Sequence, residues 1–190
     1  RNDWFEVGLR QTELLDPYAA HFFRPQREFY GPLRGPVSLP PDLGARLVFF
    51  VRDPRDVLVS AWHSFAFTHV EPKGRRALRT FRRGRQMMLE MGMDAWVRHR
   101  ARDWMRPLFE RYDVQRRASE DPWVVRYDEF RADPEAFVLG LCELLGARPP
   151  ESWVAQWVEW AQQGRSSVVM PEGHVRSGHS GQWQDELQPE

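Results

Sequence analysis

The stretch that decides the fold is ARLVFFVRDPRDVLVSAW, residues 45–62. Residues 45–51 form an apolar run rich in Val and Phe, which predicts a strand covered on both faces, as in a parallel sheet. Asp53 and Pro54 then form an N-cap and first-turn pair, and apolar residues recur at helical spacing as far as Ala66. We therefore expect a buried strand that turns directly into a buried helix.

The same order recurs later in the chain. Residues 123–127 (WVVRY) predict a second strand, and Asp133 with Pro134 predicts the start of a helix that ends at Gly146. A further helix is expected over residues 151–163. Strand, helix, strand and helix in this order predict an α/β fold, a parallel sheet flanked by helices, in one domain that covers residues 1–190.

Three other segments have a weaker pattern. Residues 1–45 hold many prolines and glycines and predict mostly loop, whereas the arginine-rich residues 71–93 have few apolar positions and predict a mobile or surface segment. Asp94 is expected to cap a helix that runs to about Tyr112, with Pro107 bending or breaking it.

Composition limits the classes of function. The 190 residues carry 27 Lys and Arg against 27 Asp and Glu, so no global field favours a nucleic-acid partner. No apolar run reaches the length of about 20 residues that a membrane span needs. The one cysteine, Cys142, has no Cys or His neighbours at metal-ligand spacing. We therefore expect a reducing, cytoplasmic setting, no metal and no membrane span.

The first candidate site is the turn after residues 45–51. Arg52 stands at the carboxyl end of the predicted strand, where α/β sheets bind ligands, and the helix that follows offers free N–H groups to an anion. Ser60 lies about two helical turns further on and could serve the same group. An alternative of about equal weight is that Arg52 only pairs with Asp56, while Ser60 bonds its own preceding turn.

The second candidate site is HVRSGHSGQW, residues 174–183. Two glycines, an arginine and several hydroxyls at close intervals could bring backbone amides and a guanidinium around a phosphate, with Trp183 anchoring the loop or covering a base. By itself this pattern is also typical of a plain surface loop.

Together these segments resemble the sulfotransferases that use 3′-phosphoadenosine 5′-phosphosulfate (PAPS). Residues 52–60 are similar to the family's 3′-phosphate-binding strand and helix, and residues 176–183 are similar to its Arg-x-Gly-x-x-Gly-x-Trp motif. Residues 125–134, followed by Leu144-Leu145-Gly146, resemble the strand and helix between them. The likeness extends from about residue 47 to the end of the chain and is nearest to bacterial members.

The resemblance implies a P-loop-NTPase-like, three-layer fold and a set of donor-binding residues. Arg52 and Ser60 would hold the 3′-phosphate, Arg176 with the amides of Ser177 and Gly178 would close on it, and Tyr127 would contact the adenosine. Ser166 and Ser167 fall near the family's adenine contact. PAPS would be the co-substrate, and a small-molecule or glycan hydroxyl or amine would be the acceptor; the transfer needs no metal.

Two parts of the family pattern have no match. The first is the Lys/Arg-Ser-Gly loop that cradles the 5′-phosphosulfate, so we expect a partial domain that starts downstream of the first strand. The second is the catalytic histidine, for which His21 and Glu28 are the nearest candidates, although a solvated surface role fits each of them too.

Two other classes of function stay open at this point. The chain could be a non-catalytic module that keeps the 3′-phosphate site and binds nucleotide without turnover. The six arginines between residues 75 and 85 could instead bind an acidic partner or nucleic acid, against the alternatives of a solvated helix face or a lid over the acceptor.

Overall fold

The computed structural model describes residues 18–24, 30, 33, 35–40, 43–162 and 180–188. The chain divides into two compact units. Unit 1 comprises residues 1–48 and 70–123, and unit 2 comprises residues 49–69 and 124–190. The predicted strand-to-helix turn belongs to unit 2, and the arginine-rich segment belongs to unit 1.

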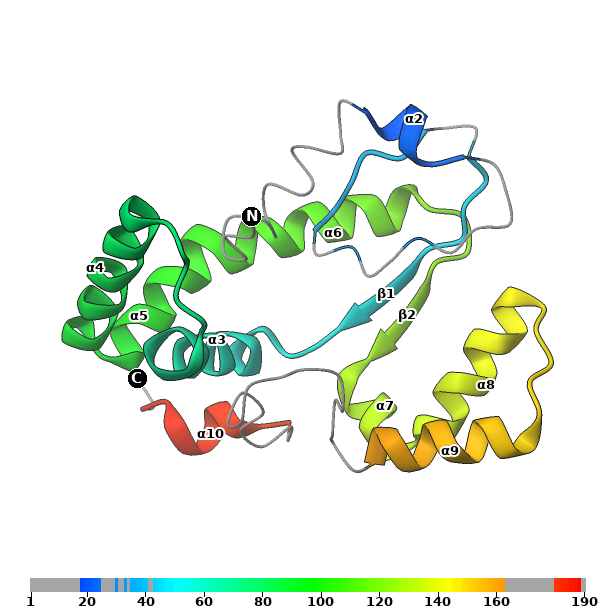
Figure 1. Ribbon diagram of the computed structural model, residues 1–190. Coiled ribbons are helices and arrows are strands. Elements are labelled where there is room, and N and C mark those ends of the chain that lie inside the picture. The colour runs from blue at the N-terminus through cyan, green and yellow to red at the C-terminus, as the bar shows by residue number, and fades with distance from the viewer. Residues whose placement is uncertain are drawn as a thin grey trace. The chain divides into compact units, whose positions relative to one another are not determined.

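The two predicted strands pair in a small sheet, nearly all of it in unit 2. β1 (Val48–Val51) and β2 (Trp123–Arg126) lie side by side and run in the same direction (Figure 1). Within the described residues, these are the strands of an α/β arrangement in which the connection from β1 to β2 is helical. The predicted order of strand and helix is therefore confirmed.

The strands differ from the prediction in length and burial. Residues 45–47 precede β1 without joining it, although the Leu47 carbonyl accepts a hydrogen bond from the Trp123 N–H at 2.9 Å, and Tyr127 begins a helix instead of ending β2. Phe49 and Val125 are buried, but Phe50 is 50% exposed and Val124 is 40% exposed. The prediction of a strand covered on both faces is therefore wrong: the second face of this short sheet is only partly covered.

Helices of unit 2 begin at Pro54, Pro134 and Glu151, as predicted, whereas the helices that begin at Tyr127 and Gln182 have no counterpart in the sequence prediction. The helices described in unit 2 are α3 (Pro54–His63) with its π-helical continuation η2 (Ser64–Thr68), α7 (Tyr127–Ala132), α8 (Pro134–Leu145), α9 (Glu151–Gln162) and α10 (Gln182–Glu186). Asp53 and Asp133 cap α3 and α8 through their side chains. Gly146 ends α8 with a φ of +63°, which favours glycine.

The core of unit 2 joins α8, α9 and the sheet. Val138, Cys142 and Val154 form a buried cluster between α8 and α9. Phe50 of β1 reaches toward this cluster through edge-to-face contacts with Phe130 and Phe137, whose ring centroids lie 5.4 and 5.9 Å away. These aromatic contacts fix β1 against α7 and α8, and so fix the position of the turn that follows β1.

Unit 1 is mostly helical in its described part. It contains α2 (Ala19–Phe22), α4 (Arg75–Met91), α5 (Met93–Arg100), η3 (Ala101–Met105) and α6 (Arg106–Ala118). The predicted cap at Asp94 is wrong, since α5 begins at Met93 behind Gly92. Pro107 does not end the helix either: it stands in the first turn of α6, where its missing N–H costs little, directly after the π-helical stretch η3.

The arginine-rich segment is a regular surface helix. α4 spans 17 residues and has no buried residue, which agrees with the prediction of a surface segment. Its regularity follows from its many Arg, Met, Gln and Leu residues, which have high helix propensity even where no core is available.

Candidate functional site

Two of the predicted binding residues meet where β1 and β2 end. Arg52 follows β1 directly, and its guanidinium lies 4.6 Å from the centre of the Tyr127 ring at the start of α7. The Arg52 side chain is 20% exposed, so it is largely enclosed but still reachable from solvent. The contact with the Tyr127 ring limits the conformations that the Arg52 guanidinium can adopt.

α3 begins at Pro54, two residues after Arg52, and Asp53 is its N-cap. Asp53 accepts a hydrogen bond from the backbone N–H of Arg55 at 2.8 Å and two more from the Arg55 guanidinium, at 3.0 and 2.6 Å. The Arg55 guanidinium holds the pKa of Asp53 below its ordinary value, and Asp53 in turn raises the pKa of Arg55. Arg55 is therefore engaged with Asp53 at the start of α3.

Asp56, in the first turn of α3, connects this turn with the C-terminal segment. Its side chain is fully buried and accepts hydrogen bonds from the backbone N–H groups of Gly181, at 2.7 Å, and Trp183, at 3.3 Å. The Arg52 Nε lies 3.9 Å from the same carboxylate. The ion pair between Arg52 and Asp56 that the alternative assumes is therefore present, and binding of an anion by Arg52 stays a prediction.

Further contacts hold the C-terminal segment along α3. The Trp183 ring lies 3.5 Å from the Arg55 guanidinium, and His63 Nε2 lies 2.5 Å from a Glu186 carboxylate oxygen. α10 consequently packs beside α3 (Figure 1). The two predicted segments, residues 52–60 and 176–183, thus meet through the described end of the second one.

Sequence reasoning missed Asp56 as a hydrogen-bond acceptor for a distant segment. The signal that could have found it is a carboxylate in the first turn of a helix, followed directly by Val57, Leu58 and Val59. A buried carboxylate needs hydrogen-bond donors, and backbone amides of a glycine-containing turn can approach it closely. The predicted anchoring of the loop by Trp183 agrees with the stacking on Arg55.

Of the remaining predicted residues, the structure describes Ser60 and His21. Ser60 lies one helical turn beyond Asp56 on α3, where it is exposed. His21 is exposed on α2 in unit 1. The other candidates, which are Glu28, Ser166, Ser167, Arg176, Ser177 and Gly178, lie outside the described residues.

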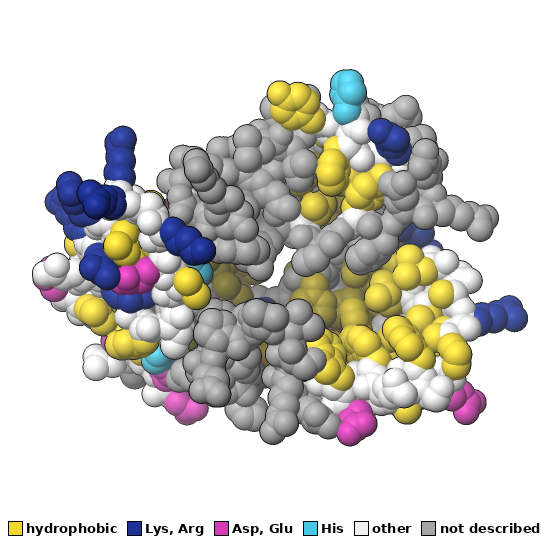
Figure 2. Space-filling view, in the orientation of Figure 1, with side chains coloured by type: hydrophobic (Ala, Val, Ile, Leu, Met, Phe, Trp, Pro, Cys, Tyr) yellow, Lys and Arg dark blue, Asp and Glu magenta, His cyan; other side chains and the backbone are white. Residues whose placement is uncertain are grey.

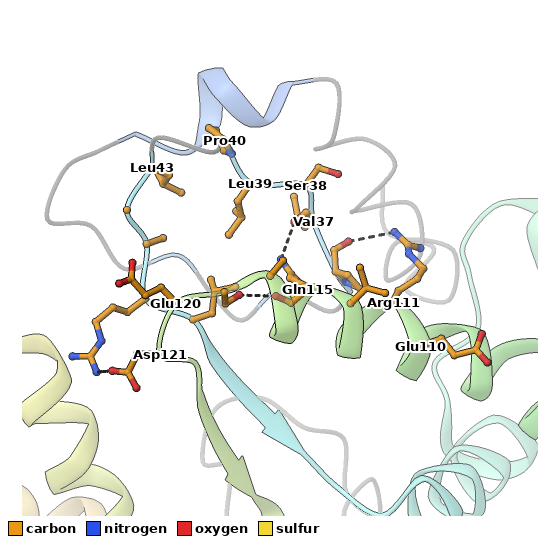
Figure 3. Close-up of a pocket in the computed structure, with 18 of the residues that line it drawn as sticks. Val37, Ser38, Leu39, Pro40, Leu43, Glu110, Arg111, Gln115, Glu120 and Asp121 are labelled. Carbon is orange, nitrogen blue, oxygen red and sulfur yellow. Dashed lines mark hydrogen bonds and ion pairs between the residues drawn. The ribbon is translucent and has the colours of Figure 1, made fainter.

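Unit 1 has a cavity of about 1070 Å³ that contains none of the predicted site residues. Figure 3 shows it between the segment around Leu39 and Leu43 and one side of α6. Arg111 and Gln115 of α6 donate hydrogen bonds to the backbone carbonyls of Pro36, at 3.5 Å, and Val37, at 2.9 Å. These polar groups tie residues 36–37 to α6, so they serve the local fold of the cavity wall.

Metal-ligand clusters and membrane-spanning helices are both absent from the described residues. No three or more His, Cys, Asp or Glu side chains among them are arranged to hold a metal ion. No helix among them is both long enough and apolar enough to cross a membrane. The turn after β1 offers a cation beside an aromatic ring, and this pair suits an anionic ligand with a ring system, whereas the N-terminus of α3 is already capped by the Asp53 side chain.

The sequence comparisons agree with this chemistry. A family model described as "Sulfotransferase domain" matches residues 37–190, which is about four fifths of the chain. Comparisons with curated proteins and with solved structures returned no significant match. The family match begins before β1 and includes α3, both strands and the C-terminal turn that packs on Asp56. The chain belongs to the sulfotransferase domain family.

Proposed function

We propose that this protein transfers a sulfuryl group from PAPS to a hydroxyl or amine of a small-molecule or glycan acceptor. Membership of the sulfotransferase domain family supports a transferase, and the donor and the acceptor class are our proposal. The observation that carries it is the position of Arg52, enclosed between the Tyr127 ring and the start of α3.

Arg52 is proposed to bind the 3′-phosphate of the nucleotide, and Ser60 to assist it from the next part of α3. Tyr127 is proposed to contact the adenosine, since its ring already lies against the Arg52 guanidinium at 4.6 Å. Arg176 with the amides of Ser177 and Gly178 would close on the same phosphate, while Ser166 and Ser167 would contact the adenine. Support for a closing role is that residues 181–183 are held on Asp56 in the first turn of α3.

The reaction depends mainly on positioning and charge. Sulfuryl transfer needs acceptor, sulfur and leaving oxygen in line, and positive groups where negative charge grows on the leaving phosphate. Arg52 supplies a fixed positive charge at the nucleotide's 3′ side. His21 and Glu28 stay our candidates for the base that takes the acceptor's proton.

We further propose that both units belong to one sulfotransferase domain with a three-layer, P-loop-NTPase-like sheet. The family match supports this, because residues 37–190 include a large part of unit 1 and the whole of unit 2. A cytoplasmic location is proposed from the single cysteine, which is buried and free.

The experiment that tests the proposal is calorimetric titration with 3′-phosphoadenosine 5′-phosphate, the desulfated product. Wild-type protein is expected to bind it, and Arg52→Ala is expected to weaken binding by about 10- to 100-fold, the value of one charge-assisted hydrogen bond. Arg148→Ala removes an exposed arginine between α8 and α9 of the same unit and is the matched control. Equal losses in both variants would contradict the proposed role of Arg52.

A second measurement separates the enzyme from a non-catalytic nucleotide-binding module. PAPS with a radiolabelled sulfuryl group is incubated with the protein and a mixture of phenolic, amine and glycan acceptors. Label transferred to an acceptor supports the enzyme. Nucleotide binding that depends on Arg52, without any transferred label, would support the binding module instead.

A further inference from the structure

The exposed side of α4 carries a dense group of arginines. Residues 71–91 contain seven Lys and Arg against two Glu. Glu71 accepts a bidentate pair from Arg82, at 3.0 and 2.7 Å, and lies 3.9 Å from Arg85. No ion pair in the described part of the chain involves the other arginines of this helix, which are Arg75, Arg76, Arg79 and Arg83. A strong positive charge is therefore left on this helix, although the whole chain is neutral.

These arginines lie on one face of α4. Arg75, Arg79 and Arg83 are four residues apart, which places them in one row with a rise of about 6 Å between neighbours. All three are exposed, whereas Leu78 and Phe81 are half-buried on another side of α4. Figure 2 shows Lys and Arg side chains gathered over α4. The arginine row thus faces solvent.

Apolar side chains are exposed at the other end of the same helix. Met87, Leu89 and Met91 have exposed fractions of 54%, 45% and 44%. α4 therefore presents arginines along its first three turns and exposed apolar side chains in its last turns. On a lipid surface, cations of such a helix can contact headgroups while its exposed apolar side chains enter the acyl boundary.

We propose that α4 binds the surface of a bilayer containing anionic lipids. Arg75, Arg79 and Arg83 contact headgroup phosphates and carboxylates, for which the planar guanidinium offers paired N–H donors. Met87 and Met91 enter the outer acyl region. A dissolved polyanion would satisfy the arginines but would offer nothing to exposed methionine side chains, so these side chains favour the lipid surface. The zero net charge of the chain does not oppose this contact, because charges further than about 8–10 Å from the membrane surface are screened by salt.

The test is co-sedimentation of the full chain with vesicles of phosphatidylcholine alone and of phosphatidylcholine mixed with phosphatidylserine. We expect binding to the mixed vesicles only, decreasing as salt is added. Each arginine near an anionic surface contributes about a fivefold change in partitioning, so replacing three predicts a loss of about 100-fold. The variant with this loss carries Arg75→Gln, Arg79→Gln and Arg83→Gln.

A control variant changes the net charge equally at exposed arginines elsewhere in the sequence. It carries Arg24→Gln, Arg102→Gln and Arg148→Gln, and we expect binding within about threefold of wild type if the α4 row is the contact. Met87→Ser with Met91→Ser is a second test variant, which should weaken vesicle binding several-fold while leaving all the arginines in place. Circular dichroism confirms that each variant keeps its helix content.

Three results would overturn the proposal. They are equal losses in the two triple variants, equal binding to both kinds of vesicle, and tight binding to heparin or single-stranded DNA without binding to mixed vesicles. The last result would assign the arginine row to a dissolved polyanion. None of these outcomes depends on nucleotide binding, so they do not test the proposed sulfuryl transfer.

Discussion

Replacing Asp56 by Asn should release the C-terminal turn from α3 while leaving most of unit 2 folded. The Asp56 carboxylate accepts the amides of Gly181 and Trp183 and is fully buried, so both of its oxygens take part in this contact. An Asn side chain has nearly the same shape but only one acceptor oxygen. Its NH₂ group would face one of the two backbone N–H donors, and that donor would lose its partner.

The size of the effect follows from these two hydrogen bonds. A hydrogen bond to a charged group contributes about 1.5–3 kcal/mol, a neutral one contributes about 0.5–1.5 kcal/mol, and a buried donor left without an acceptor costs about 1–3 kcal/mol. The shorter bond, from Gly181 at 2.7 Å, carries more of the total than the bond from Trp183 at 3.3 Å. Asp56→Asn should therefore destabilise the docked turn by about 2–4 kcal/mol.

Amide hydrogen exchange measures this local loss directly. Since each 1.36 kcal/mol is a factor of ten, protection of the Gly181 and Trp183 amides should fall by about 30- to 1000-fold. Amides in α8 should keep their protection. Asp185→Asn, which removes an exposed carboxylate from α10, is the matched control and should change these values by less than threefold. Unchanged protection in Asp56→Asn would refute the assignment of Asp56 as the anchor of this turn.

Other changes at the same turn have separate expected outcomes. Gly181 has a φ of +86°, so Gly181→Ala should weaken docking of α10 by about 1–2 kcal/mol, seen as faster exchange of the Trp183 amide; an unchanged rate would contradict the observed backbone. Trp183→Leu removes the ring stacked on Arg55 and should cost about 0.5–1 kcal/mol in thermal denaturation, more than the same change at the exposed Trp153. Arg55 lowers the pKa of Asp53 from 3.8. The Asp53–Arg55 pair therefore stabilises the fold fully above pH 3.8, and this stabilisation is lost as the pH falls through the lowered pKa of Asp53. Asp53→Asn should be less stable than wild type at neutral pH by urea denaturation, and the difference should vanish in acid; a constant difference would argue against the pair.

The local parts of the fold could be predicted because the signals lie close together in the sequence. Asp53 and Pro54 mark the start of α3, and Gly146 ends α8 in the left-handed conformation. In each case the residue acts on its own few neighbours, through a side-chain cap or a permitted φ. The strand before Arg52 was found for the same reason, since a run of Val and Phe favours strand by itself.

What could not be predicted depends on partners far away in the chain. Asp56 contacts residues about 125 positions later, and nothing in residues 45–62 identifies that partner. The partial exposure of Phe50 is also a tertiary property, because it depends on how much of the sheet's second face α7 and α8 cover. Helix α4 was missed as a regular helix because it lacks buried residues, whereas its residue propensities alone are sufficient.

The resemblance to sulfotransferases is confirmed as a family assignment, and the described residues 181–183 contact the first turn of α3. The family match confirms the family, and the contacts of Asp56 with Gly181 and Trp183 give a physical reason for the proximity of the two segments. The roles given to all the site residues stay predictions: Arg52, Ser60, Tyr127, Ser166, Ser167, Arg176, Ser177 and Gly178 for the nucleotide, and His21 and Glu28 for catalysis.

The most direct test of the central claim compares two nucleotides that differ only in the 3′-phosphate. Affinities of adenosine 3′,5′-bisphosphate and adenosine 5′-monophosphate are measured for wild type, Arg52→Ala and Arg148→Ala. If Arg52 binds the 3′-phosphate, wild type and Arg148→Ala should prefer the bisphosphate by about 10- to 100-fold, and Arg52→Ala should have nearly equal affinities for the two. A preference that survives in Arg52→Ala would contradict the proposed site at the turn after β1.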